Sequence, residues 1–327
     1  VYDQYAYDEL GQLIREDNKD ANKSYTYTYD SRGNILEKKT YAFTPGTLGT
    51  AQKTDSYGYA TDSWKDRLTS YNGQTITYDS IGNPLTYNNG SAYTFTWEGR
   101  QMQSASKGNQ TYSYTYNSDG LRASKTVGNT TYHYYWNSGK LIAMTYDDHY
   151  MIFTYTESGT PFSVTCYDAY LDKEYECLYI TNLQGDVVGI YDAAKSSMVI
   201  SYTYDAWGRL VGKDGTSSDY AQLEMNNPLL YRGYQYDYET GFYYLQSRYY
   251  DPTVGRFLNA DSVLSIHPSS SECNLFRYCN NNPINRIDET GTMAVAVATS
   301  GATYAAFVAW LSTLGSANFW NPVGWII

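Results

Sequence analysis

The chain has 327 residues, a formal net charge of −11, and 40 tyrosines against 9 phenylalanines. Its length allows one large β domain or two smaller ones. The acidic balance argues against a nucleic-acid partner, because binding a phosphate backbone requires a basic stripe that releases counterions. A buried tyrosine needs a hydrogen-bond partner for its hydroxyl, so this many tyrosines suit half-buried sheet faces and favour an all-β fold.

Cysteine and histidine are too sparse to predict a metal centre. No two cysteines form a Cys-x-x-Cys pair, the histidines share no metal-ligand spacing, and no glycine-rich phosphate loop is visible. We therefore expect no metal and no cofactor, while one or two disulfides remain open. The residues concerned are Cys166, Cys177, Cys273, Cys279, His133, His149 and His267. A start at Val1, without Met or a signal peptide, suggests a piece of a longer polypeptide.

A tyrosine-rich unit recurs along the first two thirds of the chain. Its pattern is Tyr-x-Tyr-Asp-x-x-Gly-(Asn/Gln/Arg)-(Leu/Ile), and its spacing of about 20 residues is typical of arrays whose units cannot bury a face alone. Clear copies occupy residues 5–13, 27–35 and 202–210, and looser copies occupy 76–84, 114–121, 134–141 and 153–159.

Each unit predicts a β-hairpin arm. In Tyr25–Tyr29, tyrosine alternates with threonine, which places aromatic rings on one sheet face and hydroxyls on the other. The following Asp or Asn is expected to start a turn by bonding the backbone two residues on, with Gly at positive φ three residues after it. Stacked units should build one long twisted ribbon with tyrosine ladders, its aromatic rings buried between successive turns of the ribbon.

The composition changes twice near the C-terminus. We predict three regions: a repeat ribbon over 1–226, a closing domain over 227–291, and the start of a variable apolar segment over 292–327. The last region contains no charged residue. Its stretch 293–314 is long enough to span a bilayer but rich in Ala, Gly, Ser and Thr, so it predicts either a membrane contact or the start of another domain.

The tyrosine units, together with the run from Tyr231 to Phe257, resemble the RHS/YD-repeat family and its RHS-associated core domain. Within that run the strongest matches are Glu239-Thr240-Gly241, Tyr243–Pro252 and Gly255-Arg256-Phe257. The resemblance implies a β-ribbon that spirals into a hollow shell, closed by the core domain and enclosing a C-terminal toxin as its cargo. It also implies a bacterial protein of competition and toxin delivery that is secreted or held at the cell surface, with a secretion-system or cell-wall partner.

The family's core can also cleave itself in a manner likened to aspartic proteases. Matched motif to motif, the two carboxylates would be Asp261 and Asp288, and the cut would fall near Thr292–Met293. Two carboxylates sharing a proton can activate a water as general acid and base. The family's arginine before the first aspartate is Ala260 here, which predicts that Asp261 lacks the cation holding it ionised. The alternative is that both aspartates only form turns.

Three functions therefore remain open from the sequence. The first is a structural shell that encloses and delivers a polymorphic toxin. The second is an autoproteolytic core that uses Asp261 and Asp288, the only enzyme activity we expect. The third is a cell-surface adhesin whose tyrosine and tryptophan rings stack on glycans.

Overall fold

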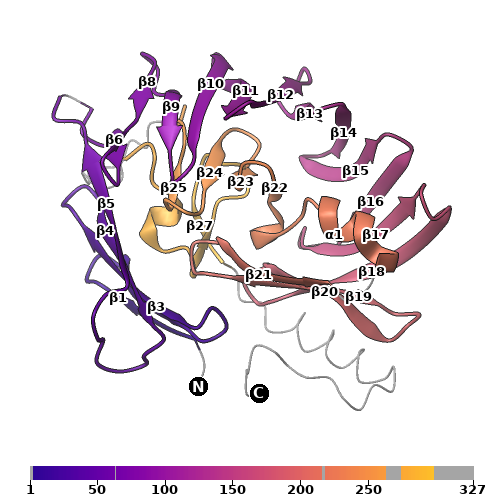
Figure 1. The fold of residues 1–327 in the computed structure, drawn as a ribbon, viewed down its shortest axis with the longest axis horizontal. Helices are drawn as coiled ribbons and strands as arrows, with labels where there is room; N and C mark the ends of the chain where they lie inside the picture. The colour runs from indigo at the N-terminus through magenta and orange to yellow at the C-terminus, as the bar shows by residue number, and fades with distance from the viewer. Residues whose placement is uncertain (1–2, 63, 216–217, 263–273, 298–327) are drawn as a thin grey trace.

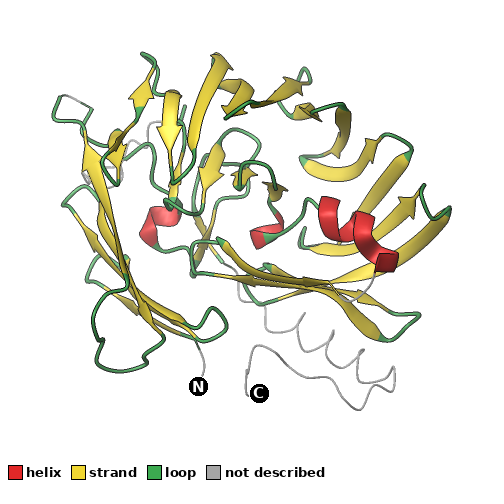
Figure 2. Cartoon of the chain, in the orientation of Figure 1, coloured by secondary structure: helices red, strands yellow, loops and turns green. Residues whose placement is uncertain are grey.

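The computed structural model describes residues 3–62, 64–215, 218–262 and 274–297 (Figure 1). Strands make up nearly all of their regular structure, and helices are confined to short segments (Figure 2). The first 21 strands form a 7-stranded and a 14-stranded sheet, in which each strand pairs antiparallel with its neighbour in sequence. The prediction of an all-β ribbon of hairpins is confirmed.

The strands of the ribbon are short, with two to nine residues each. They are β1 (Gln4–Tyr7), β2 (Leu13–Asn18), β3 (Lys23–Tyr29), β4 (Ile35–Ala42), β5 (Lys53–Tyr59), β6 (Leu68–Tyr71), β7 (Gln74–Thr75), β8 (Thr77–Tyr78), β9 (Pro84–Asn88), β10 (Ala92–Glu98), β11 (Gln101–Lys107), β12 (Gln110–Tyr116), β13 (Arg122–Val127), β14 (Thr130–Asn137), β15 (Lys140–Tyr146), β16 (His149–Tyr155), β17 (Pro161–Asp168), β18 (Lys173–Thr181), β19 (Val187–Asp192), β20 (Ser197–Tyr204) and β21 (Leu210–Gly215).

The aspartate of the repeat unit forms the turn that the sequence predicts. Asp30 Oδ1 accepts hydrogen bonds from the backbone N–H groups of Arg32 and Asn34 at 2.8 and 2.9 Å. Gly33 has φ +74°, where a side chain would be strained. The same carboxylate or amide bonding, followed by a positive-φ glycine, recurs in the turns that begin at Asp8, Asp79, Asn117, Asn182 and Asp205.

In several units the aromatic residue at the end of the strand, just before the turn, donates a hydrogen bond to the backbone of the preceding unit. Tyr116 donates its hydroxyl to the carbonyl of Met102 at 2.8 Å. Where tryptophan replaces tyrosine, the indole N–H makes the same bond: Trp136 donates to Arg122 O at 2.7 Å. This bond requires a polar atom at the far edge of the ring, which explains why the repeats use Tyr and Trp rather than Phe. Its further members join Tyr29 to Leu13, Tyr59 to Ile35, Trp97 to Pro84, Tyr155 to Leu141 and Tyr204 to Val187.

The ribbon curves round a central segment, and its late strands return to its early ones (Figure 1). Lys38 on β4 pairs with Asp205 after β20 at 3.2 Å, with both side chains buried. Asn18 Nδ2 donates to Tyr204 O at 2.9 Å. The backbone N–H of Ala206 donates to Glu16 Oε1 at 2.8 Å. Partners almost 200 residues apart in sequence thus join the two ends of one circuit of the ribbon.

The central segment carries the remaining elements. They are the 3₁₀ turns η1 (Ser218–Tyr220), η2 (Tyr231–Gly233) and η3 (Cys279–Asn281), the helix α1 (Ala221–Asn226), a four-stranded sheet of β22 (Gln235–Asp237), β23 (Phe242–Tyr244), β24 (Tyr249–Asp251) and β25 (Arg256–Phe257), and the pair β26 (Arg286–Ile287) and β27 (Val295–Ala296). The ribbon sheet ends at Gly215, and the boundary at residue 227 stays a prediction.

Many ribbon tyrosines point at this central segment rather than at another turn of the ribbon, which corrects the expectation of burial between turns. Tyr57 donates to Val254 O at 3.1 Å, Tyr93 to Thr240 O at 3.0 Å and Tyr179 to Asn227 Oδ1 at 2.6 Å. Tyrosines of the central segment also donate hydrogen bonds to ribbon carbonyls: Tyr243 donates to Gly208 O at 2.8 Å, and Tyr250 donates to Trp207 O at 2.7 Å. The core of the molecule therefore contains an aromatic layer in which many tyrosine hydroxyls are hydrogen-bonded.

The sequence also raised expectations about disulfides, metal sites and a membrane-spanning segment. The thiols of Cys166, Cys177 and Cys279 are free and buried, and Cys273 lies outside the described residues. The part of the chain that the structure describes holds no cluster of histidine, cysteine and carboxylate groups suited to a metal ion. Within the same ranges, every helix is too short or too polar to cross a bilayer. The candidate membrane stretch 293–314 lies mostly outside them.

Candidate active site at the end of the central segment

The structure brings Asp261 and Asp288 to the same guanidinium group. Arg248 Nη2 lies 2.9 Å from Asp261 Oδ2 and 3.3 Å from Asp288 Oδ2. The two carboxylates therefore cannot lie farther apart than these two distances combined. All three side chains are at least nine-tenths buried, so the two acids form one site in a low-dielectric setting.

Arg248 is held in place by the backbone around it. It lies between β23 and β24, and its Nη1 donates to Leu275 O at 2.9 Å while its Nε donates to Gly291 O. The guanidinium carbon lies 3.5 Å from the centre of the Phe257 ring, a cation–π contact. These contacts use both sides of the guanidinium and fix the direction in which Nη2 faces the two aspartates.

The segment of the expected cut is fastened to the same site. Asp288 Oδ1 accepts the backbone N–H groups of Thr292 at 2.9 Å and Met293 at 3.1 Å. Ser247 Oγ donates to Thr290 O at 2.6 Å. Gly291 has φ +72°, and a Cβ there would meet Leu245 O at 2.7 Å, so only glycine fits. Asp288 therefore does form a turn, and that turn places the Thr292–Met293 peptide against its carboxylate.

Burial sets the ionisation of this site. It raises the pKa of Asp288 above its ordinary value, although the Arg248 charge and the two backbone N–H donors act in the opposite direction. Burial also lowers the pKa of Arg248 to about 10, despite the two carboxylates. A carboxyl group with a raised pKa beside a peptide nitrogen is suited to proton transfer.

The structure places a cation beside Asp261, where the sequence led us to expect none. Position 260 is alanine, from which we expected an unpaired first carboxylate, yet Arg248 supplies the charge from a different strand end. The Ala260 carbonyl is itself bound by Arg100 Nη1 at 2.5 Å. The signal for Arg248 was present, since it lies in the Gln-Ser-Arg-Tyr-Tyr motif (246–250), but its pairing depends on tertiary contacts.

Known proteins contain sequences similar to this chain. The RHS Repeat family model matches residues 5–44. The chain is 30% identical over 299 residues to the tRNA nuclease WapA of Bacillus subtilis (strain 168), covering 90% of this chain and 12% of that protein. It is 24% identical over 317 residues to double-stranded DNA deaminase toxin A of Burkholderia cenocepacia (strain H111), covering 88% of this chain and 20% of that protein.

A solved structure shares the fold. The TcdB2–TccC3–TEV crystal structure superposes with a TM-score of 0.67 at 20% identity, covering 88% of this chain and 15% of the other. The chain thus spans between 12% and 20% of the length of these three proteins. The repeat match, the relatives and the shared fold together show that the chain belongs to the RHS/YD-repeat family.

Proposed function

We propose that this chain is part of the shell of a bacterial polymorphic toxin, which encloses a C-terminal toxin segment until delivery. The proposal rests on one observation, the joined circuit of the ribbon round the central segment. Lys38–Asp205 connects the two ends of that circuit, and the ribbon tyrosines bond the central segment on several sides. A wall closed in this way can keep a polypeptide from proteases and from the cell that makes it.

The relatives support this assignment. Two of them carry a nuclease or deaminase name, and the chain matches a part of each that is far shorter than the whole. We infer that the matched part is the container and that the enzymatic cargo follows it. Such a protein is secreted or displayed at the bacterial surface, and its partners are its own cargo and a delivery apparatus.

Protease protection tests the container. A full-length polypeptide that contains this chain, tagged at its C-terminus, is treated with proteinase K under native conditions and in rising denaturant. We expect the tag to survive until the sheet unfolds, while the surface-exposed connection 43–52 is cut at once. Loss of the tag at the same rate as that connection, under native conditions, would refute the shell.

Self-cleavage at Thr292–Met293 is the second function that the geometry supports, because Asp288 contacts the nitrogen of that peptide bond. In the reaction, Asp261 removes a proton from a water molecule, whose oxygen attacks the Thr292 carbonyl carbon. Asp288 gives a proton to the Met293 nitrogen as the C–N bond breaks. The products are a carboxylate at Thr292 and a protonated amine at Met293, the proton taken up by Asp261 returns to Asp288, and Arg248 positions both acids throughout.

Intact mass measurement of residues 1–327 tests this reaction. We expect two fragments that meet at Thr292–Met293, and uncut chain for Asp288→Asn and Asp261→Asn. Glu289→Gln is the matched control, since Glu289 is the next residue but faces Lys140 at 3.3 Å with more than half of its side chain exposed. A wild-type chain as intact as Asp288→Asn would rule out self-cleavage while leaving the shell untouched.

A further inference from the structure

The ribbon binds the residue directly before Asp261 through both of its backbone polar groups. The Ala260 N–H donates to Gly82 O at 3.1 Å, and the Ala260 carbonyl accepts a hydrogen bond from Arg100 Nη1 at 2.5 Å. Gly82 lies in the turn between β8 and β9, and Arg100 lies in the turn between β10 and β11. Ala260 is fully buried. Two turns of the ribbon therefore fix the backbone from which the first carboxylate extends.

Position 260 is packed too closely for a long side chain. A Cβ built on Gly82 would lie 2.8 Å from the Ala260 Cβ and 2.6 Å from the Trp64 ring. The backbone of Gly82 thus packs directly against the methyl group of Ala260. A longer side chain at position 260 would displace this turn of the ribbon. The cations near Asp261 therefore come from other parts of the fold.

The turn that carries Arg100 is itself bonded to the preceding unit. Asn83 Nδ2 donates to Gly99 O at 2.7 Å and to Asp79 Oδ2 at 2.7 Å. Gly99 has φ +56°, which the turn between β10 and β11 requires. Arg100 thus extends from a turn that its neighbouring unit holds in place, and its guanidinium reaches the Ala260 carbonyl from a fixed point.

Arg100 also brings a second positive charge to the site. Arg248 contacts Asp261 from the central segment at 2.9 Å, while Arg100 binds the residue before Asp261 from the ribbon. Burial is the main cause of the lowered pKa of Arg248, and the charge of Arg100 acts in the same direction. The two guanidinium groups are therefore close enough to interact, with the Ala260–Asp261 backbone between the elements that carry them.

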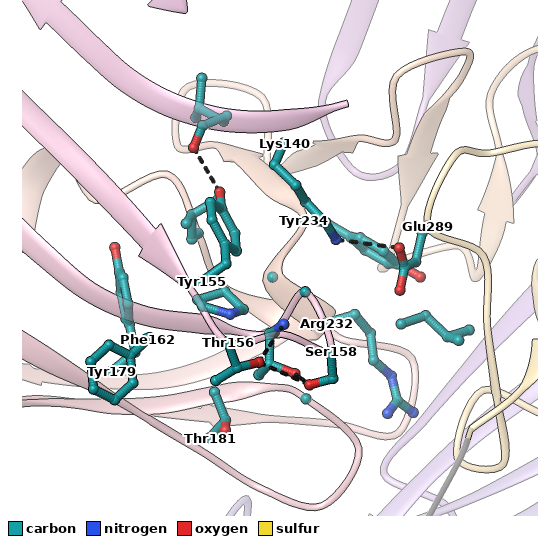
Figure 3. A pocket seen from close by; sticks show the side chains of 18 of the residues that line it. Lys140, Tyr155, Thr156, Ser158, Phe162, Tyr179, Thr181, Arg232, Tyr234 and Glu289 are labelled. Carbon is teal, nitrogen blue, oxygen red and sulfur yellow. Dashed lines mark hydrogen bonds and ion pairs between the residues drawn. The ribbon is translucent and has the colours of Figure 1, made fainter. Parts of the chain in front are cut away.

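The ribbon makes a weaker contact beside the second acid. Glu289, next to Asp288, forms an ion pair with Lys140 of β15 at 3.3 Å, and the two side chains are 54% and 36% exposed (Figure 3). A pocket of about 430 Å³ opens here between the ribbon turns and the central segment, and both residues line it. Solvent screens such an ion pair. The ribbon therefore restrains the site mainly on the Asp261 side.

We propose that Arg100 is a positioning residue for self-cleavage, which holds the Ala260 carbonyl and so fixes the direction in which Asp261 faces Arg248 and Asp288. Both acids belong to the central segment, whereas Arg100 belongs to the ribbon. The site is then complete only after the ribbon has closed round the central segment, and cleavage follows closure. The inference rests on the self-cleavage proposed above, and it names a residue of the ribbon that controls this reaction.

Pulse-chase synthesis of the chain 1–327 in a cell-free system tests this role, with the fragments of the Thr292–Met293 cut quantified by mass spectrometry. Arg100→Gln removes the charged donor. We expect its fragments to appear at least about tenfold more slowly, since a displacement of about 1 Å in a reacting group can cost about 10²-fold in rate. Arg100→Lys should recover most of the rate, because a single bond to Ala260 O needs one cationic donor and not the two-pronged fork of arginine.

Arg15→Gln is the matched control. Arg15 is also a partly exposed arginine of the ribbon, and its Nη2 donates to the carbonyls of Thr44 and Gly46 at 2.7 and 2.8 Å, so it holds the connection 43–52 and should leave cleavage at the wild-type rate. Equal rates for Arg100→Gln and the wild type would overturn the proposal. Equally slow cleavage in Arg100→Lys or in Arg15→Gln would overturn it as well. A wild-type chain that stays intact would reject self-cleavage itself, and the role of Arg100 with it.

Discussion

Replacing Asp237 with asparagine should be among the most destabilising single changes in the molecule. Asp237 accepts hydrogen bonds from Arg122 Nη1 at 2.6 Å, Arg122 Nη2 at 2.9 Å and Lys125 Nζ at 3.2 Å. Arg122 and Asp237 are both fully buried. Burial alone would raise the pKa of Asp237, yet Arg122 and Lys125 hold it below its usual value. These contacts bind β13 of the ribbon to β22 of the central segment.

The cost follows from the charge left behind. Asp237→Asn leaves Arg122 buried without its counter-charge, and removing one partner of a buried pair costs about 3–5 kcal/mol. That is a large share of the roughly 5–15 kcal/mol by which domains are stable. In guanidinium chloride unfolding followed by circular dichroism, we expect the midpoint to fall by about 1 M.

The control is an ion pair at the surface. Glu37 and Lys39 lie 2.8 Å apart with side chains 41% and 37% exposed, and solvent screens such a pair. Glu37→Gln should therefore unfold at the wild-type denaturant concentration. If Asp237→Asn also unfolds at the wild-type denaturant concentration, the Arg122–Asp237 pair does not stabilise the contact between the ribbon and the central segment, and the argument from burial is wrong.

Two further changes probe the ribbon. Burial, together with the neighbouring Asp205 carboxylate, raises the pKa of Glu16 to about 8, whereas the ordinary pKa of a glutamate is 4.5. Between these two pH values the folded protein binds a proton that the unfolded chain does not. The free energy of unfolding should therefore fall by about 1.4 kcal/mol for each unit by which the pH rises. Glu16→Gln should remove this contribution to the slope in denaturant titrations at pH 5, 7 and 9, and a slope equal to that of the wild type would contradict it. Tyr155→Phe removes the donor to Leu141 O and should cost about 1–2 kcal/mol. Tyr155→Trp should recover part of it, since indole makes the corresponding bond at Trp136; equal losses in both variants would contradict the donor role.

Local features of the fold were predictable from the sequence. The turn at Asp30 depends only on residues within five positions, so its carboxylate bonds and the positive φ of Gly33 followed from the pattern. Strand alternation in Tyr25–Tyr29 was equally local. The need for a hydrogen-bond donor at positions such as Trp136 was not predicted from the sequence and came from the structure.

Long-range features were not predictable in the same way. Arg248 and Asp288 are forty residues apart, and neither has a sequence signal for the other. Asp261 and Asp288 were paired only through family resemblance, whereas their common contact with Arg248 depends on how β24 and β26 pack. The direction of the aromatic face was likewise undetermined, because alternation shows that one face is aromatic but not what covers it. The glycan-binding alternative remains an untested prediction.

The central segment has a mechanical consequence for the ribbon. In a repeat array whose units contact only their neighbours, unfolding can begin at one end and proceed one unit at a time. Here Tyr57, Tyr93 and Tyr179 bond one shared inner body from positions far apart in the chain. Unfolding a single hairpin would disturb the central segment and so weaken the hydrogen bonds that this segment makes to hairpins elsewhere in the ribbon. The ribbon should therefore unfold cooperatively. It should resist the loss of single hairpins and unfold in one step once the central segment is displaced.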